Sequence, residues 1–231
     1  MQRFYPLYLY KIKRMKESGK SIYNLRHDFE KATLNESDVD SNPAKQFEKW
    51  MHQALEAKVV EALAMTLSTA NKQGRPSGRI LYLREYADNR FAFFTNYKSK
   101  KAEDLLENPF ASMNFFWQEL ERQVRIEGSV EFHSKEASDK YFYSRPHYSK
   151  IGAWSSPQSK VIKDRAELEG LVTEFDTKYK TEDVPRPEYW GGYILKATYY
   201  EFWQGRKSRL HDRIAYTLQD DGTWKIERLA P

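Results

Sequence analysis

Apolar side chains recur at helical spacing in the first quarter of the chain. The stripe consists of Phe47, Trp50, Met51 and Leu55. Asn42 can cap a helix that begins just after it, and Pro43 suits the first helical position. The pattern therefore predicts an amphipathic helix that covers a core and ends near Lys58.

Most of the remaining pattern is typical of short strands joined by turns. Apolar-rich segments bounded by turn residues predict strands at residues 64–70, 79–87, 90–96, 111–117, 122–133, 191–203, 208–218 and 223–230. Further helices are predicted at residues 99–107, 134–144 and 164–179. Because few helices separate the strands, we expect a mainly β fold with packed helices (α+β), in which an antiparallel sheet closes into a barrel. A parallel doubly wound sheet would need a helix after nearly every strand.

Composition and charge limit the partners. The chain has 231 residues, of which 40% are hydrophobic, and this is enough for one sizeable core. The formal charge of +5 depends on Arg3, Lys11, Lys13 and Arg14, without which it is 5 − 4 = +1. The electrostatic case for nucleic acid is therefore weak, and we expect no such partner. We expect residues 1–14 to be an upstream extension without a role in the fold.

Cysteine is absent from the sequence, which excludes disulfides, thiolate nucleophiles and zinc–cysteine sites. This fits a reducing cytoplasm, the location we expect. No apolar run approaches the ~20 residues of a membrane helix, and the basic residues follow the apolar run at 4–10 rather than precede it. We therefore expect neither a membrane span nor an export signal. The phosphate-binding patterns GxGxxG and GxxxxGKS/T are also missing, so a nucleotide would have to be bound in another way.

Two lysines lie at the start of a predicted helix. Ser99 is a candidate cap, which puts Lys100 and Lys101 in the first turn, where the helix dipole is positive. Free backbone N–H groups together with two ammonium groups make a suitable phosphate site. The alternative is a pair of solvated lysines beside Glu103 and Asp104.

The segment "RILYLR" carries an arginine at each end, Arg79 and Arg84. On a strand, Leu81 and Leu83 share the face of Arg79, and Arg84 lies on the opposite face. The two arginines could bind anionic groups at both ends of a flat ligand. The alternative is a strand whose ends reach solvent.

A further group of donors surrounds a predicted helix end. Its members are Tyr141, Arg145, His147, Tyr148, Ser149 and Lys150. Arginine, serine and tyrosine together can form a phosphate site, because all three donate hydrogen bonds to phosphate oxygens. A surface loop is the alternative interpretation.

The segment "FWQGRKSRLHDR" places Arg209, His211 and Arg213 at every second position. On a strand these side chains project to one face. They repel one another unless an anionic or aromatic group lies across them, so they predict a ligand there. The alternative is an exposed edge strand with solvated arginines. No Ser-His-Asp order and no HxxxH pattern is visible, and we expect no metal.

Together these segments resemble the pyridoxamine 5'-phosphate oxidase family over residues 24–231. The similarity rests on the order and spacing of "RILYLREY", "FFTNYKSKKAEDLLENP", "FWQELERQVRIEG", "YFYSRP", "SKIGAWSSPQS", "YWGGY", "EFWQGRKSRLHDR" and "WKIERLAP". The resemblance implies an FMN-binding split β-barrel and a homodimer with FMN bound between the subunits. It also implies a single domain at residues 24–231 after a flexible extension at residues 1–23.

The resemblance further implies which residues contact the ligands. Positions that match the family's FMN contacts are Arg79, Ile80, Leu81, Tyr82, Leu83, Arg84, Phe94, Thr95, Lys100, Lys101, Gln123, Gln158, Ser159, Trp203 and Arg213. Positions that match its substrate contacts are Arg26 through Phe29, Arg84, Tyr141, Arg145, Ser149, Arg209 and His211. Arg209 and His211 would have the catalytic role of orienting the substrate ring and the reacting group.

The implied reaction is the FMN-dependent oxidation of pyridoxamine 5'-phosphate or pyridoxine 5'-phosphate by dioxygen. The products are pyridoxal 5'-phosphate, hydrogen peroxide and, from the amine, ammonia. Arg84 stands where the family commonly has lysine, Lys100 where arginine is usual, and Phe29 where tyrosine is usual, which bears on affinity more than on the reaction. Two alternatives stay open: a related split-barrel flavoprotein with another substrate, and a non-catalytic carrier of pyridoxal 5'-phosphate or nucleic acid.

Overall fold

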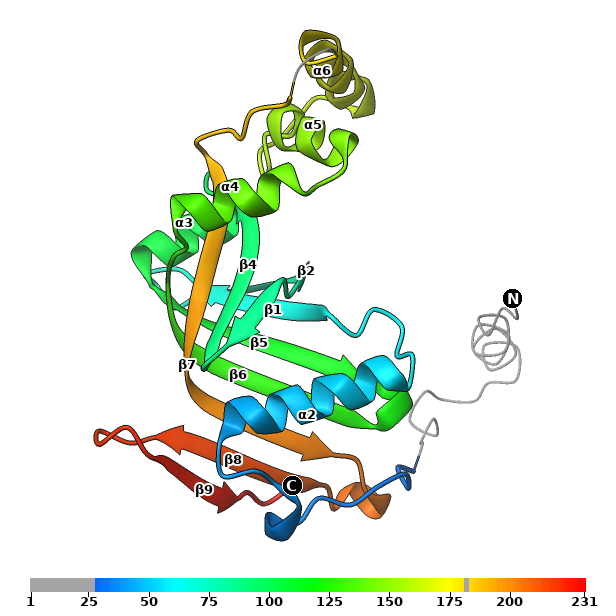
Figure 1. The fold of residues 1–231 in the computed structure, drawn as a ribbon, viewed down its shortest axis with the longest axis vertical. Coiled ribbons are helices and arrows are strands. Elements are labelled where there is room, and N and C mark those ends of the chain that lie inside the picture. Colours follow the sequence, from blue (N-terminus) through cyan, green and yellow to red (C-terminus); the bar gives the residue numbers. More distant parts are fainter. Residues whose placement is uncertain (1–27, 181–182) are drawn as a thin grey trace, which may run out of the picture.

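The computed structural model describes residues 28–180 and 183–231. In these ranges nine strands form one sheet of order β2-β1-β5-β6-β7-β4-β3, and β8 and β9 continue from β7. The strands are β1 (Ala64–Ala70), β2 (Pro76–Tyr82), β3 (Glu85–Ala87), β4 (Arg90–Asn96), β5 (Phe110–Trp117), β6 (Arg122–Phe132), β7 (Trp190–Gln204), β8 (Asp212–Leu218) and β9 (Trp224–Arg228). All pairings are antiparallel, and the sheet curls into a half-barrel (Figure 1), which confirms the predicted fold class. The predicted extension at residues 1–23 lies outside the described part of the chain.

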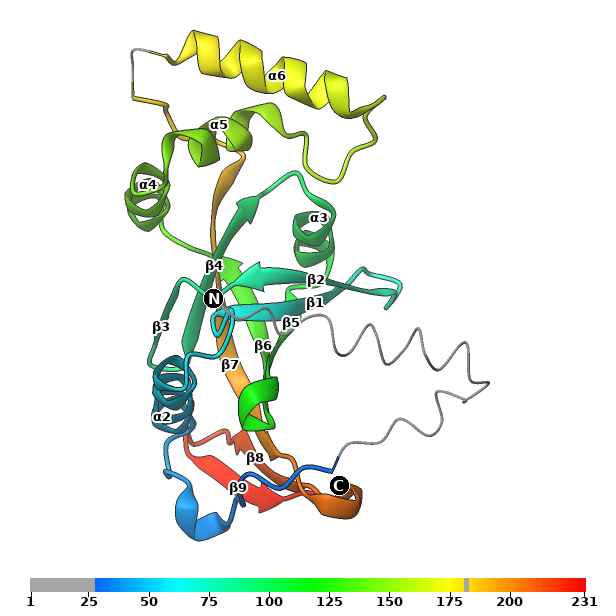
Figure 2. The ribbon, with the colours of Figure 1, turned by 90° about the vertical axis from the view of Figure 1, so that its right-hand side faces the viewer.

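Helices pack around the sheet and beyond one of its ends. The α-helices are α2 (Pro43–Glu56), α3 (Lys100–Glu107), α4 (Lys135–Tyr143), α5 (His147–Ser155) and α6 (Arg165–Lys178). Short 3-10 turns are η2 (Glu36–Asp38), η3 (Gln118–Leu120) and η4 (Lys207–Arg209). Figure 2 shows α4, α5 and α6 grouped near the start of β7, with β8 and β9 at the other end of the molecule. Of the helices described, none is long and apolar enough to cross a membrane.

The helix α2 begins as the sequence predicts. The side chain of Asn42 accepts hydrogen bonds from the backbone N–H groups of Ala44 and Lys45, and Pro43 occupies the first position. The buried members of the predicted stripe are Phe47, Trp50 and Met51. Leu55, at the end of the stripe, is 49% exposed and contributes little to the core.

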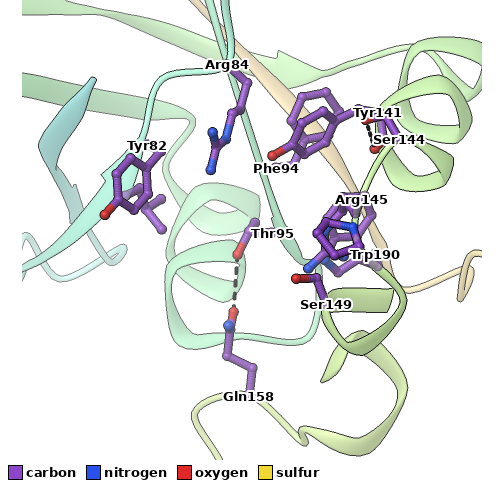
Figure 3. Close-up of a pocket in the computed structure, with 12 residues that line it drawn as sticks. Tyr82, Arg84, Phe94, Thr95, Tyr141, Ser144, Arg145, Ser149, Gln158 and Trp190 are labelled. Carbon is purple, nitrogen blue, oxygen red and sulfur yellow. Dashed lines mark hydrogen bonds between the residues drawn. The ribbon is translucent and has the colours of Figure 1, made fainter. Parts of the chain in front are cut away.

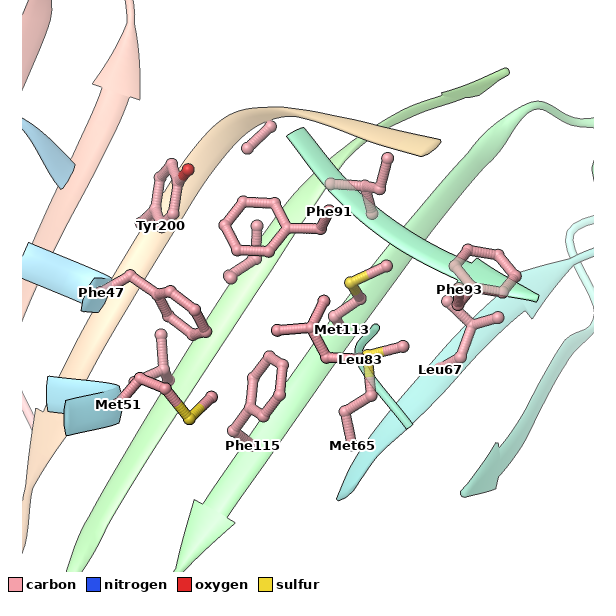
Figure 4. Packing of buried hydrophobic residues seen from close by; sticks show 14 of the residues in the cluster. Phe47, Met51, Met65, Leu67, Leu83, Phe91, Phe93, Met113, Phe115 and Tyr200 are labelled. Atoms are coloured by element: carbon pink, nitrogen blue, oxygen red, sulfur yellow. The ribbon is translucent and has the colours of Figure 1, made fainter. Parts of the chain in front are cut away.

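Phe47 lies at the centre of the main core. Its ring contacts Phe91 edge to face at 5.1 Å between centroids and Phe115 at 5.3 Å. Figure 4 shows that these rings come from α2 and from strands on both sides of the half-barrel. Burial of each such side chain contributes about 1.5–3 kcal/mol, so this cluster holds the curled sheet to the helix.

A second, smaller cluster fixes the helical layer. Its buried members are Phe142, Ile151, Ala153, Tyr179, Val184 and Trp190. They come from α4, α5, the residue after α6, the segment before β7 and the first residue of β7. The cluster therefore holds the α4–α5 junction against the sheet.

The predicted strand at 79–87 is two strands. Between β2 and β3, the N–H of Leu83 donates to the carbonyl of Leu63 at 2.9 Å, and the N–H of Arg84 donates to Ala92 at 3.0 Å. The backbone thus changes partner from the β1 side to β4 at this point. The side chain of Leu83 turns into the core, where it is 1% exposed.

The predicted strand at 208–218 is wrong at its start, because β8 begins only at Asp212. Ser208 and Arg209 have φ values of 57° and 63°. This left-handed conformation cannot continue an extended strand. Arg209, His211 and Arg213 therefore do not share one strand face.

The helix α5 was not predicted. It follows Pro146 directly, and its buried residues are Ile151, Ala153 and Ser155. Three buried residues in nine give a weak periodic pattern, so tertiary packing on the second cluster stabilises this helix more than local sequence does. Of the predicted donors only Arg145 lies between the two helices; Tyr141 is on α4 and the others are on α5, where His147 and Tyr148 are exposed.

Candidate functional site

A cavity of about 440 Å³ opens between the sheet and the α4–α5 junction. It is lined by Leu81, Tyr82, Arg84, Phe94, Thr95, Tyr141, Ser144, Arg145, Pro146, Ser149, Gln158 and Trp190. Figure 3 shows Arg84, Tyr141, Arg145 and Ser149 gathered around one space, with Thr95 and Gln158 beside it. The cavity thus brings together predicted cofactor and substrate residues from four distant segments.

Arg145 is the clearest sign of an anion site. Its guanidinium lies over the ring of Trp190 at 4.6 Å, and its Nη1 is buried with no hydrogen-bond partner among the described residues. Burial lowers the pKa of Arg145, and the nearby charge of Arg84 lowers it further. An unsatisfied buried donor is costly unless a ligand accepts from it, so this geometry favours an anionic group in the cavity.

Stacked aromatic rings form one wall of the cavity. Tyr141 stacks on Phe94 at 4.1 Å between centroids, and Trp190 lies parallel to both. The guanidinium of Arg84 lies 5.0 Å from the ring of Tyr82 and 5.6 Å from that of Tyr141. The wall holds Arg84 close to Arg145, and no acidic partner of Arg84 is found among the described residues, so positive charge is concentrated on the cavity.

Lys101 is a buried cation in the first turn of α3. It is 6% exposed, and its Nζ donates to Thr95 Oγ1 at 3.0 Å, Ser99 Oγ at 2.9 Å and Gln158 Oε1 at 2.9 Å. All three acceptors are neutral. Burial lowers the pKa of Lys101 to about 8, and the charge of Arg79 adds to this effect. The helix begins after Ser99 as predicted, although the hydroxyl donates to Asn96 O and does not cap.

Arg79, Lys100 and Lys101 form a basic cluster, in which Arg79 and Lys100 have different partners. Arg79 is tied to β1 and β2 by bonds to Leu67 O, Thr69 Oγ1 and Ser77 Oγ. Lys100 pairs with the buried carboxylate of Asp104. Burial alone would raise the pKa of Asp104, but hydrogen bonds from Lys100, Thr69 and Ser77 outweigh it and leave the pKa lowered. Lys100 is thus half exposed and paired beside Asp104, whereas Lys101 is buried and not solvated; its phosphate contact stays a prediction.

Three predicted cofactor residues form a row at the other end of the sheet. Gln123, Trp203 and Arg213 are register partners on β6, β7 and β8, so their side chains lie on the same face. Arg213 donates through Nε and Nη2 to both oxygens of Glu201, at 2.9 and 3.0 Å. Glu201 is 2% exposed and also pairs with Arg125. This buried carboxylate, which we did not predict, holds Arg213 in the row.

Arg209 and His211 lie next to that row in the turn before β8. The ring of His211 is 4.6 Å from Trp203 and 5.7 Å from Phe29 between centroids. Phe29 packs edge-on against Trp203 at 5.6 Å. The N-terminal segment thus reaches the turn, as the family contacts imply. Arg26 lies outside the described residues.

The two groups of predicted residues do not meet within one chain. Trp190 begins β7 and lines the cavity, whereas Trp203 lies near its end. They are 203 − 190 = 13 positions apart, or about 43 Å along an extended strand. Ile80 is 64% exposed outside the cavity, and Ser159 is exposed just after Gln158. Trp190, Ser144 and Pro146 line the cavity without having been predicted; Trp190 lies in the motif "YWGGY".

These features define the class: an antiparallel half-barrel whose basic and aromatic side chains are suited to phosphorylated, flat ligands. The chain belongs to the pyridoxamine 5'-phosphate oxidase family. Residues 51–179 match the family described as pyridoxamine 5'-phosphate oxidase, and residues 190–231 match the pyridoxine 5'-phosphate oxidase C-terminal dimerisation region. The resemblance inferred from the sequence is therefore confirmed.

Relatives and solved structures agree with this assignment. A pyridoxine/pyridoxamine 5'-phosphate oxidase from a Cyanothece species is 52% identical over 211 residues, covering 91% of this chain and 99% of the relative. The crystal structure of PhzG from Burkholderia lata 383, in complex with tetrahydrophenazine-1-carboxylic acid, has a TM-score of 0.82 at 29% identity and covers 89% of this chain and 100% of that one. A pyridoxamine 5'-phosphate oxidase-related, FMN binding protein from Nostoc punctiforme, with a TM-score of 0.65 at 19% identity over 80% of this chain and 97% of that one, supports the fold.

Proposed function

We propose that the protein oxidises pyridoxamine 5'-phosphate and pyridoxine 5'-phosphate to pyridoxal 5'-phosphate with FMN as cofactor and dioxygen as final acceptor. The proposal rests on the cavity that Arg84 and Arg145 both line, where Nη1 of Arg145 is buried and has no hydrogen-bond partner among the described residues. A phosphate ester satisfies such a donor. The 52% identical oxidase relative supplies the substrate class.

The basic cluster around Lys101 suits the phosphate of FMN. Lys101 is a buried ammonium that donates to three neutral oxygens in the described structure, so a phosphate dianion would offset its desolvation. Arg79 and the N–H groups of the first turn of α3 would share that phosphate. When bound, FMN supplies the acceptor for the hydride that leaves the substrate's exocyclic carbon, and dioxygen reoxidises it.

A homodimer would unite the two separated groups of residues. The outer face of the sheet carries Ile80, Tyr82 and Phe116, which are 64%, 39% and 52% exposed. Exposed apolar side chains on one sheet face suit an interface between subunits. In a two-fold dimer, the cavity of one copy would receive the row of Gln123, Trp203 and Arg213 from the other copy. The match to a C-terminal dimerisation region supports this arrangement.

Each substrate residue then has a positioning role. Arg145 and Arg84 would bind the ester phosphate, with Ser149 and Tyr141 as neutral donors beside them. Charge-assisted hydrogen bonds contribute about 1.5–3 kcal/mol each, so phosphate recognition would dominate affinity. Arginine at position 84 can donate two parallel bonds where a lysine offers a point charge. From the second copy, Arg209 and His211 would orient the pyridine ring.

The decisive experiment is an absorbance scan of the purified protein, followed by anaerobic addition of pyridoxamine 5'-phosphate. We expect a yellow protein whose flavin band bleaches and returns on admission of air with formation of hydrogen peroxide. Unphosphorylated pyridoxamine is the matched control and should bleach the band far more slowly. Bleaching by NADH but not by pyridoxamine 5'-phosphate would indicate a related flavoprotein with another substrate. A colourless protein that cannot be reconstituted with FMN would indicate a carrier.

A further inference from the structure

Asp212 connects three separate segments beside the proposed substrate residues. Its Oδ2 accepts from the backbone N–H of Leu34 at 3.1 Å and from Arg206 Nη1 at 2.7 Å, and its Oδ1 accepts from Arg228 Nη1 at 3.0 Å. Burial raises the pKa of Asp212, but these bonds outweigh it and leave the pKa below its ordinary value. The carboxylate is thus ionised at neutral pH and is occupied by protein donors.

Arg206 contacts the neighbouring histidine through its backbone. The N–H of Arg206 donates to Nδ1 of His211 at 3.0 Å. A backbone N–H can only donate, so Nδ1 must carry a lone pair. In a neutral imidazole the proton then lies on Nε2, on the other side of the ring. The hydrogen bond therefore assigns the tautomer of His211.

The surroundings of His211 favour the neutral ring. It packs against Trp203 and Phe29, and burial lowers its pKa, with a further decrease from Arg209 and an opposing increase from Asp212. The turn also carries Arg206 and the Lys207–Glu30 ion pair, which brings in the N-terminal segment together with Asp28. A neutral ring with one fixed tautomer presents a donor at Nε2.

We propose that Asp212, acting through Arg206, is a positioning residue that holds His211 as the Nε2–H tautomer, so that His211 donates a hydrogen bond to an oxygen of the substrate. The side chain of Arg206 is fixed by the carboxylate while its backbone N–H fixes the ring, so one residue couples the two. This proposal rests on the proposed function for the identity of the substrate. It makes His211 a hydrogen-bond donor and not a general base.

Two substitutions of His211 test the donor directly. The amide nitrogen of glutamine can reach the position of Nε2, whereas the shorter asparagine reaches only that of Nδ1. We expect His211→Gln to keep kcat/KM within about tenfold of wild type and His211→Asn to lose about a hundredfold, as expected for a lost donor and an unsatisfied partner. Equal losses in the two variants, with both proteins folded and FMN-loaded, would overturn the proposal.

A second measurement tests Asp212. The chain has five histidines, so 15N-histidine labelling resolves the imidazole signals of the protein as purified. We expect wild type to show His211 as the Nε2–H tautomer, and Asp212→Asn to show tautomer exchange together with a lower kcat. Glu36→Gln is the matched control, because Glu36 also binds Arg228 but neither Arg206 nor His211.

The outcomes separate the two proposals. If wild type shows the Nε2–H tautomer but does not oxidise pyridoxamine 5'-phosphate, the proposed function fails while the tautomer assignment stands. If wild type oxidises the substrate but His211 is protonated on Nδ1, or Asp212→Asn leaves both the tautomer and kcat unchanged, the inference fails alone. If Asp212→Asn does not fold, the tautomer of wild-type His211 and the two variants at position 211 still decide whether His211 is the donor that the proposal requires.

Discussion

Arg145 and Arg209 lie at opposite ends of β7 in one chain. Arg145 packs on Trp190, the first residue of the strand, and Arg209 lies in the turn that follows its last residue, Gln204. Both match substrate contacts of the family. If both guanidinium groups contact one small ligand, as the family contacts imply, the proposed site requires two copies of the chain.

This arrangement predicts complementation between inactive variants. Arg145→Leu and Arg209→Leu should each lower kcat/KM at least about tenfold, because each removes a charge-assisted contact. In a two-fold mixed dimer one site receives both substitutions and the other receives neither. Each mixed dimer should therefore have about half of wild-type activity, which corresponds to about a quarter in an unseparated random mixture. Co-expression with two different tags, followed by activity assay of the doubly tagged dimer, measures this.

The control combines two substitutions that lie on the same side of the proposed site. Arg145→Leu combined with Arg79→Met leaves no intact site in any mixed dimer, since both residues lie on the cavity side of the molecule. This mixture should stay at the activity of the single variants. Recovery in the control, or no recovery in the test pair, contradicts a site shared between subunits.

The buried ammonium of Lys101 predicts a pH dependence of FMN affinity. Its pKa is lowered from 10.5 to about 8 by burial and by Arg79. A phosphate dianion beside it favours the charged form, so FMN binding takes up a proton when pH exceeds about 8. FMN affinity should therefore decrease as pH rises above this value. Flavin fluorescence quenching across the range measures the dissociation constant.

Lys101→Met tests how much the buried charge contributes to FMN affinity and how much it destabilises the FMN-free fold. The variant should bind FMN about 10- to 100-fold more weakly, the equivalent of about 1.5–3 kcal/mol. Between pH 8 and 10.5 the unfolded chain binds more protons at Lys101 than the FMN-free fold does. The free energy of unfolding of the FMN-free wild type should thus rise with pH in this window, relative to Lys101→Met. A pH-independent difference in urea denaturation would show that Lys101 is not desolvated as described.

Sequence patterns predicted the elements whose residues alternate or repeat. The helix α2 begins at Pro43 with the predicted cap, and strands such as β1 and β4 fall at the predicted residues. The family motifs led to Arg145, Thr95 and Gln158, which the fold brings to one cavity. The elements were predicted correctly because local periodicity determines them, and the ligand contacts of the three cavity residues stay predictions.

The errors have a different physical origin. The turn at Ser208 and Arg209 adopts left-handed φ values without a glycine, so the residue types there do not predict it. The different surroundings of Lys100 and Lys101 depend on Asp104, which tertiary packing buries. Glu201 lies in an apolar strand, where its role is visible only once β8 brings Arg213 beside it. Contacts between distant segments carry no signal in a local pattern.

Glu201 should contribute to both the stability of the fold and the affinity for FMN, although its place in an apolar strand indicates neither. Glu201→Gln leaves Arg213 and Arg125 without their shared carboxylate. We expect the free energy of unfolding to fall by about 2–3 kcal/mol. This is near the low end for a buried ion pair, because both arginines reach solvent. FMN affinity should fall as well, because Arg213 matches an FMN contact. Glu131→Gln is the control: Glu131 pairs with Arg90 and Lys196 at the surface and should leave stability and FMN affinity unchanged. Urea denaturation and FMN titration of both variants provide the comparison.

Gly128 allows β6 and β7 to approach at the irregularity in their register, which falls between Glu127 and Gly128. A Cβ at this position would lie 1.9 Å from the carbonyl oxygen of Lys196 and 3.0 Å from the Cα of Ala197. Both are backbone atoms and cannot rotate away, so Gly128→Ala should force the strands apart and destabilise the fold by about 3 kcal/mol. Gly170→Ala is the matched control, since a Cβ there meets nothing within 4 Å and the helix α6 should gain up to about 1 kcal/mol. Opposite shifts of the urea midpoint are expected; if Gly128→Ala is as stable as Gly170→Ala, the two strands are not packed this closely.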